Sequence, residues 1–149
     1  MYLVECFNDE TVLRVLGVHP KRIRRMKGKG NVLNKLKKEV QEAHIGLVDR
    51  DARSLNPVPL APFMEKETRQ GLALYVWGGN RLVVVDDKIE DWIFRAAAQA
   101  KVRLPRKDAH ELHRLEARVM HPLLLPVLEE LVKASPKSVV DLQELLGLK

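Results

Sequence analysis

The chain has 149 residues, of which 46% are apolar and 31% charged; this is the balance of one folded domain and excludes a disordered chain. Its single cysteine, Cys6, excludes a disulfide framework and a cysteine-rich zinc site. A formal net charge of +6 favours a polyanionic partner, and the sequence has no run of about 18–20 apolar residues that would span a membrane.

The first half of the chain alternates short apolar runs with amphipathic segments. Asn8 or Asp9 can cap the first helix and Gly17 can end it, while the basic segment 22–26 suits an edge strand because charged side chains discourage further pairing. Strand, helix, strand, helix, strand with short connections is typical of a parallel sheet with crossover helices. The expected strands are 2–5, 22–26 and 44–48, and the expected helices have apolar positions at 12–16 and 32–40.

The second half of the chain predicts a loop, a hairpin and then helices. Residues 54–63 contain three prolines and are expected to form a loop. Two apolar runs, 72–77 and 81–85, are joined through Gly78 and Gly79, which is typical of a β-hairpin. The helices that follow have apolar positions at 89–100, 112–119, 124–132 and 139–146.

Acidic residues follow the predicted parallel strands where those strands end. Glu5 ends the first strand, and Asp49 and Asp51 follow the third; in the common 2-1-3 strand order these two strands are neighbours. The three carboxylates would then lie within reach of one another, and crowded carboxylates ionise together only beside a cation; oxygen ligands select Mg²⁺, Mn²⁺ or Ca²⁺. Asp9 is either a helix cap or a further ligand, and Glu90 is either a ligand of a second metal ion or part of an acidic helix N-terminus.

At these residues the chain resembles the Toprim family, the catalytic domain of topoisomerases, bacterial primases and several nucleases. That family carries a Glu at the end of strand one and an Asp-x-Asp at the end of strand three, which correspond to Glu5 in LVEC and to Asp49 with Asp51 in LVDRD. Asp9 stands where the nuclease branch often has a further acid, whereas Cys6 stands where the family usually has Gly. The resemblance covers roughly the first half of the chain, and no Gly follows the Asp pair closely.

The resemblance implies both a fold and an activity. We predict a Toprim-like, mainly parallel α/β sheet at 1–100, followed by C-terminal helices at 101–149 that pack on it as a single structural unit. The implied function is a Mg²⁺- or Mn²⁺-dependent enzyme that cleaves phosphodiesters or transfers phosphoryl groups in nucleic acid. Glu5, Asp49 and Asp51 would bind the metal and carry catalysis, with Glu5 as general base or acid. The alternative is a non-catalytic Toprim-like module that binds nucleic acid or a partner subunit.

The positive charge is concentrated between positions 21 and 38, where nine Lys or Arg residues occur without an acid. Lys27 and Lys29, with the backbone of Gly28 and Gly30, would hold a phosphate at a helix N-terminus, and Arg24 and Arg25 would extend this surface for DNA or RNA. The alternative is a solvated edge strand.

The remaining polar and aromatic residues are interpreted as structural. We interpret the five histidines as surface or structural residues, although His110 and His113 share the i, i+3 spacing of one helix face, and Trp77 and Trp92 as core residues rather than base-stacking ones. The N-terminal residues lack the basic start of a signal peptide, so we expect a cytoplasmic protein, as a monomer, a homo-oligomer or with a partner subunit.

Overall fold

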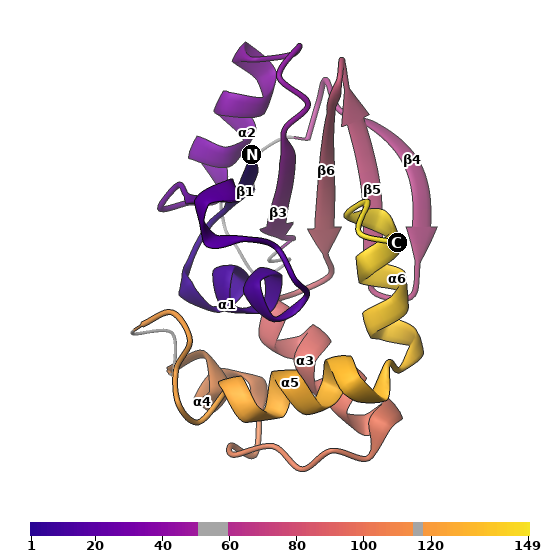
Figure 1. The fold of residues 1–149 in the computed structure, drawn as a ribbon. Coiled ribbons are helices and arrows are strands. Elements are labelled where there is room, and N and C mark those ends of the chain that lie inside the picture. Colours follow the sequence, from indigo (N-terminus) through magenta and orange to yellow (C-terminus); the bar gives the residue numbers. More distant parts are fainter. Residues whose placement is uncertain (51–59, 115–117) are drawn as a thin grey trace.

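The computed structural model describes residues 1–50, 60–114 and 118–149, which form one mixed sheet with helices on both faces (Figure 1). The strands are β1 (Tyr2–Val4), β2 (Ile23–Arg25), β3 (Ile45–Asp49), β4 (Met64–Arg69), β5 (Leu72–Trp77) and β6 (Asn80–Val85). The helices are α1 (Phe7–Val15), α2 (Lys29–Lys38), α3 (Ile89–Ala100), α4 (Ala109–His113), α5 (Leu125–Ala134) and α6 (Lys137–Leu145).

The strand order β2-β1-β3-β6-β5-β4 confirms an α/β fold with a mostly parallel sheet. Strands β2, β1, β3 and β6 are parallel to one another, whereas β5 is antiparallel to both of its neighbours, β6 and β4. The predicted 2-1-3 order is confirmed, as are the edge position of β2 and the hairpin of β5 and β6. Because β1 and β3 are adjacent and parallel, their C-terminal ends meet at one edge of the sheet.

Apolar side chains alternate between the two faces of the sheet and build a core on each. One core includes Val4, Leu47 and Val83, which pack with apolar residues of α1, α3, α5 and α6. The other includes Leu3 and Val48, which pack with apolar residues of α2. This alternation follows from the period of two along a strand, and it makes three layers of helix, sheet and helix.

Helix α2 lies directly over Gly46 in the middle of β3. A Cβ atom at Gly46 would stand 2.8 Å from Leu36 Cδ1 and 3.0 Å from Val32 Cγ1. The missing side chain therefore allows the helix to approach the strand this closely.

Asn80 joins α2, β3 and β6 at the N-terminal edge of the parallel strands. Its side chain is 1% exposed. Its Oδ1 accepts a hydrogen bond from the His44 amide at 2.7 Å, and its Nδ2 donates to the carbonyls of Leu36 at 2.8 Å and Glu39 at 2.9 Å. A single buried amide of β6 thus satisfies three backbone groups from two other segments, the end of α2 and the residue before β3.

The C-terminal helices pack against the rest of the described chain. Helix α5 contacts α1 and α3, and α6 contacts α3 and β5 (Figure 1). The Tyr2 hydroxyl donates to the Leu146 carbonyl at 3.3 Å. Arg69 of β4 binds Asp141 at 3.0 Å and Glu144 at 2.6 Å. The end of the chain is therefore bound both by β1, through Tyr2, and by the edge strand β4.

Two parts of the fold differ from the sequence prediction. Strand β4 was not expected, because Met64–Arg69 is almost entirely exposed and has no apolar alternation. The helix expected through Val119 is wrong in its length: α4 ends at His113, and Val119 lies in a turn before Met120, whose φ is +57°. In the described part of the chain, no helix has both the length and the apolar character needed to cross a membrane.

Candidate functional site

The predicted acidic residues gather at the edge where the parallel strands end. Glu5 follows β1 directly, Asp49 is the last residue of β3, and Glu90 belongs to the first turn of α3, just after β6. Asp9 lies in the first turn of α1. Asp49 interacts electrostatically with Glu5, Asp9 and Glu90, so the structure brings these four carboxyl groups together. Asp51 lies outside the described residues.

The surroundings of Asp49 raise the pKa of its carboxyl group strongly. Burial raises its pKa to about 10, and repulsion from Asp9, Glu5 and Glu90 adds to the rise, while a hydrogen bond from the Ile89 amide opposes it. That amide stands 3.0 Å from Asp49 Oδ1 and links the end of β3 to the start of α3. Asp49 therefore retains a proton at neutral pH unless a cation replaces it.

Asp9 is fully buried and caps the first helix from within its first turn. Its Oδ2 accepts hydrogen bonds from the Cys6 amide at 3.2 Å and the Cys6 thiol at 3.1 Å. Burial raises the pKa of Asp9 well above its usual value, and the charges of Glu5 and Glu90 act in the same direction. Cys6 is the N-cap residue of α1 and is half-buried.

Glu90 is buried and contacts one residue of α1 and one of α4. It is 1% exposed, and its Oε1 accepts a hydrogen bond from Asn8 Nδ2 at 3.1 Å and contacts His113 Nδ1 at 2.8 Å. His113, from α4, thus enters the site through tertiary packing that no local sequence signal predicts.

The residues present partly fit a bound cation. Asn8 Oδ1, Asp9 Oδ1 and Glu90 Oε2 are buried oxygen atoms without a hydrogen-bond donor among the described residues. Oxygen atoms in this condition suit protons or a hard cation. Yet within residues 1–50, 60–114 and 118–149, no three His, Cys, Asp or Glu side chains are grouped so that they could hold a metal ion. A complete ligand set would thus need Asp51 or a rearrangement of Glu5.

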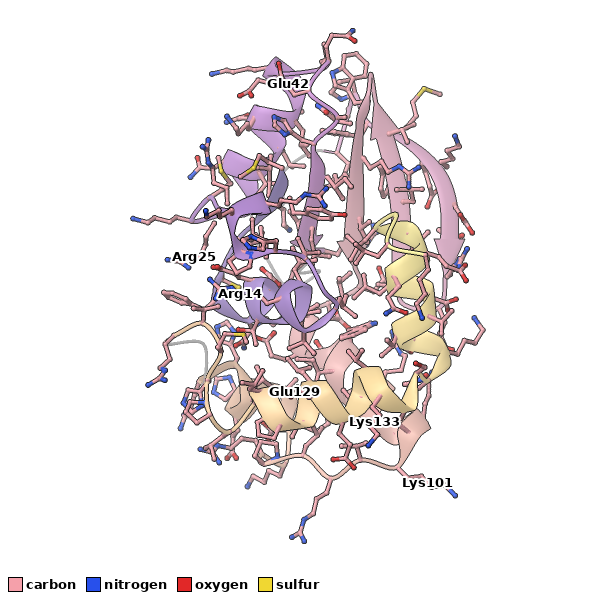
Figure 2. All side chains as sticks on the ribbon, in the orientation of Figure 1. Arg14, Arg25, Glu42, Lys101, Glu129 and Lys133 are labelled. Atoms are coloured by element: carbon pink, nitrogen blue, oxygen red, sulfur yellow. The ribbon has the colours of Figure 1, made fainter. Side chains whose placement is uncertain are left out.

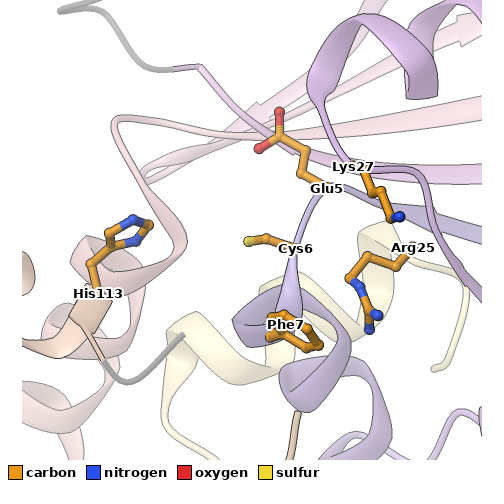
Figure 3. A pocket seen from close by; sticks show the side chains of 6 residues that line it. All are labelled: Glu5, Cys6, Phe7, Arg25, Lys27 and His113. Atoms are coloured by element: carbon orange, nitrogen blue, oxygen red, sulfur yellow. The ribbon is translucent and has the colours of Figure 1, made fainter. Parts of the chain in front are cut away.

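A cavity of about 570 Å³ opens beside the carboxyl groups (Figure 3). Glu5 and Cys6 face it from the junction of β1 and α1, and His113 faces it from the opposite side. The residues that line it are Glu5, Cys6, Phe7, Arg25, Lys27 and His113.

Two of the four predicted basic residues reach this cavity. Arg25 and Lys27 line it, whereas Arg24 is exposed on the edge strand β2 and does not line it. Lys29 is engaged elsewhere, since its Nζ donates to the Arg50 carbonyl at 2.8 Å and ties the start of α2 to the end of β3. The two lysines of the predicted phosphate site therefore do not lie together at the cavity. Lys27 lines it, whereas Lys29 stabilises the fold.

Comparison of the chain with protein-family models, with curated proteins and with solved structures found no match. The structure therefore defines the protein by its geometry alone. It is an α/β protein with acidic side chains at the C-terminal ends of its parallel strands, and Arg25 and Lys27 are among the residues that line the adjacent cavity.

Proposed function

We propose that this protein is a divalent-metal-dependent enzyme of Toprim type that cleaves phosphodiester bonds, or transfers phosphoryl groups, in DNA or RNA. The observation that carries the proposal is the pairing of two features at one edge of the sheet. Glu5, Asp9, Asp49 and Glu90 lie together there and disfavour the ionised forms of Asp9 and Asp49, and Arg25 and Lys27 line the adjacent cavity. An acidic group beside cationic side chains suits a metal ion and a phosphate held side by side.

The residues of the chain have distinct roles in this proposal. Glu5, Asp49 and Asp51 would hold Mg²⁺ or Mn²⁺, which would supply charge neutralisation at a phosphate and Lewis acidity. Lys27 and Arg25, which line the cavity, would bind phosphate oxygens. Glu5 would accept or donate the proton, because it lines the cavity whereas Asp9 is fully buried.

Specific observations also favour the rival function, a non-catalytic module that keeps the fold. The described residues contain no ready group of three metal ligands, and Cys6 occupies the position where the Toprim family usually has Gly. Such a module should show no tight Mn²⁺ site. Thermal unfolding with and without Mn²⁺ tests this, because a ligand present at about 100 times its Kd stabilises a protein by about 2.7 kcal/mol.

Cleavage assays test the enzymatic proposal directly. Wild type, Glu5→Gln and Glu65→Gln are purified identically and incubated with labelled single- and double-stranded DNA and RNA, with Mg²⁺, Mn²⁺ or EDTA. Glu65 is the matched control, because it is exposed on β4, the outer strand at the other end of the sheet from β2. We expect Glu5→Gln to lose more than tenfold in rate, or over about 1.4 kcal/mol of barrier, and Glu65→Gln to lose nothing. Equal cleavage by all three, or none by any, would leave the binding module as the function.

A further inference from the structure

Phe7 occupies an unusual place for an aromatic side chain. It is the first residue of α1, directly after Glu5 and Cys6, and its ring lines the cavity instead of joining either core (Figure 3). A large apolar ring is normally buried in a core, where it contributes most to stability. Phe7 therefore presents apolar surface to whatever enters the cavity.

Arg25 is held against this ring by a buried carboxylate. Its guanidinium carbon stands 3.9 Å from the Phe7 ring centroid, and its Nη1 binds Glu10 Oε2 at 2.7 Å. Glu10 also binds Arg14 at 2.8 Å, and the two arginines lie next to each other on the side of the molecule between α1 and α2 (Figure 2). Since the Glu10 side chain is only 9% exposed, this network fixes the guanidinium over the face of the ring.

A guanidinium stacked on an aromatic ring still has outer faces, and such faces can recognise nucleobases. Bases stack on aromatic rings and on Arg planes, and the stacking tolerates any base because every base has a π face. The cavity of about 570 Å³ lies within the range of pockets that enclose small organic groups. Lys27 lines the same cavity and would hold the adjoining phosphate.

The tryptophans do not provide such a surface at this edge. Trp92 is 2% exposed, and its Nε1 donates to the Ser138 carbonyl. Trp77 ends β5 opposite Asn80, at the sheet edge away from the carboxyl groups. Phe7 is thus the aromatic residue that lines the cavity with Glu5.

We propose that Phe7 and Arg25 form a stacking site for one unpaired nucleobase, next to a phosphate held by Lys27, so that the site takes single-stranded nucleic acid. A base inside a duplex is stacked on both sides and cannot enter a cavity without leaving its pair. The inference rests on the proposed function for the polymer that enters the site, but it does not require cleavage.

The test measures binding without metal, so that catalysis plays no part. Fluorescence anisotropy in EDTA compares a labelled single strand, the same strand with abasic sites in its central positions, and the corresponding duplex, each as DNA and as RNA. We expect wild type to bind the base-bearing strand at least about fivefold more tightly than the abasic strand, from the typical strength of base–aromatic stacking. The DNA and RNA series identify which polymer supplies the base.

Variants separate stacking from phosphate binding. Phe7→Leu should lose the preference for bases and keep the affinity for the abasic strand; Arg25→Lys, which keeps the charge and loses the plane, should also weaken that preference. Lys27→Ala should weaken both strands by the same factor. Trp77→Leu, an aromatic change at the opposite edge, should behave as wild type, with thermal midpoints confirming that each variant folds.

Each outcome either supports or overturns the stacking site at Phe7 and Arg25. Equal wild-type affinity for base-bearing and abasic strands would overturn the stacking site, as would a Phe7→Leu effect of the same size on both. A lack of binding to any strand would overturn it together with the nucleic-acid part of the proposed function. Base preference without cleavage would support the stacking site and remove only the enzymatic proposal.

Discussion

At Asp49, burial and three neighbouring carboxyl groups favour the protonated form. Its pKa rises to about 10, although the Ile89 amide stabilises one of its oxygens. The unfolded chain exposes the same side chain to water, where its pKa is near 3.8. Between these two values the folded protein holds a proton that the unfolded chain releases. The free energy of unfolding should therefore fall as pH rises through this interval.

We predict that Asp49→Asn makes the stability of the protein less dependent on pH and raises it above wild type at pH 8. Asn keeps an acceptor oxygen for the Ile89 amide and removes the charge. Urea unfolding at several pH values between 5 and 9 measures the slope. Asp86→Asn is the control, because Asp86 is exposed and paired with Arg50, and it should keep the wild-type slope. An unchanged slope in Asp49→Asn would contradict the assignment of the proton to this residue.

Lys27 combines an exposed cationic side chain with a left-handed backbone. Its φ is +59°, and Gly28 follows with a φ of +137°. A side chain at such a φ is strained, typically by about 1–2 kcal/mol. Gly would suit this position better for stability, so the Lys27 side chain destabilises the fold locally.

We predict that Lys27→Gly leaves stability unchanged or raises it by up to about 1 kcal/mol, because the relief of strain offsets the added freedom of the unfolded chain. The same change should weaken nucleic-acid binding and reduce the slope of log K against log salt by about 0.7–0.9 for the loss of one phosphate contact. Thermal unfolding and binding titrations at several salt concentrations measure both effects. A full salt slope in the variant would show that Lys27 contacts no phosphate.

At the level of elements, the contact of α2 with β3 depends on Gly46. We predict that Gly46→Ala destabilises the protein by about 1–3 kcal/mol, since the new methyl group would overlap Leu36 and Val32. Gly30→Ala, within α2 itself, meets nothing within 4 Å and should be neutral or stabilising by up to about 1 kcal/mol. Chemical denaturation of both variants makes the comparison. Similar effects of the two substitutions would mean that the helix can move away from the strand.

The elements also show what the sequence could and could not predict. The apolar runs of β1 and β3 are buried on both faces, so their strand type and their acidic ends were predictable from pattern alone. Strand β4 was not, because an exposed edge strand gains its conformation from hydrogen bonds to β5 and needs no apolar face. His113 was not assigned to the site either, because its contact with Glu90 arises from the packing of α4 on α3.

Over the whole molecule, Arg69 connects the edge strand β4 to helix α6. It binds Asp141, whose side chain is 8% exposed, and Lys137 binds the same carboxylate. Burial opposes the charge of Asp141, but these two hydrogen bonds prevail and lower its pKa below the usual value. The ionised form therefore stabilises the fold above about pH 4, and this contribution is lost as pH falls through the lowered pKa.

We predict that Arg69→Met destabilises the protein by about 1–3 kcal/mol at pH 7, because Asp141 keeps its charge and loses a partner. The difference from wild type should shrink in acid, where Asp141 becomes protonated. Glu67→Gln is the matched control: Glu67 binds the same arginine but is 43% exposed, so its loss should cost about 0–1 kcal/mol. Unfolding curves at pH 7 and pH 3 give both comparisons. A constant difference at the two pH values would place the effect of Arg69 elsewhere.

The buried amide of Asn80 affects the spacing of the carboxyl groups at the other end of β3 and β6. It fixes the register of β6 against β3 at the edge opposite the acidic group, with Ile45 beside Arg81 and, four residues later, Asp49 beside Val85. A slip by one residue would reverse the faces of β6 and leave three buried backbone groups unpaired. The register of the two strands is the same along their length. The alignment at Asn80 therefore determines how far the end of β6, and with it Glu90, lies from Asp49. Mutations near Asn80 would change the spacing of the carboxyl groups without touching any of them.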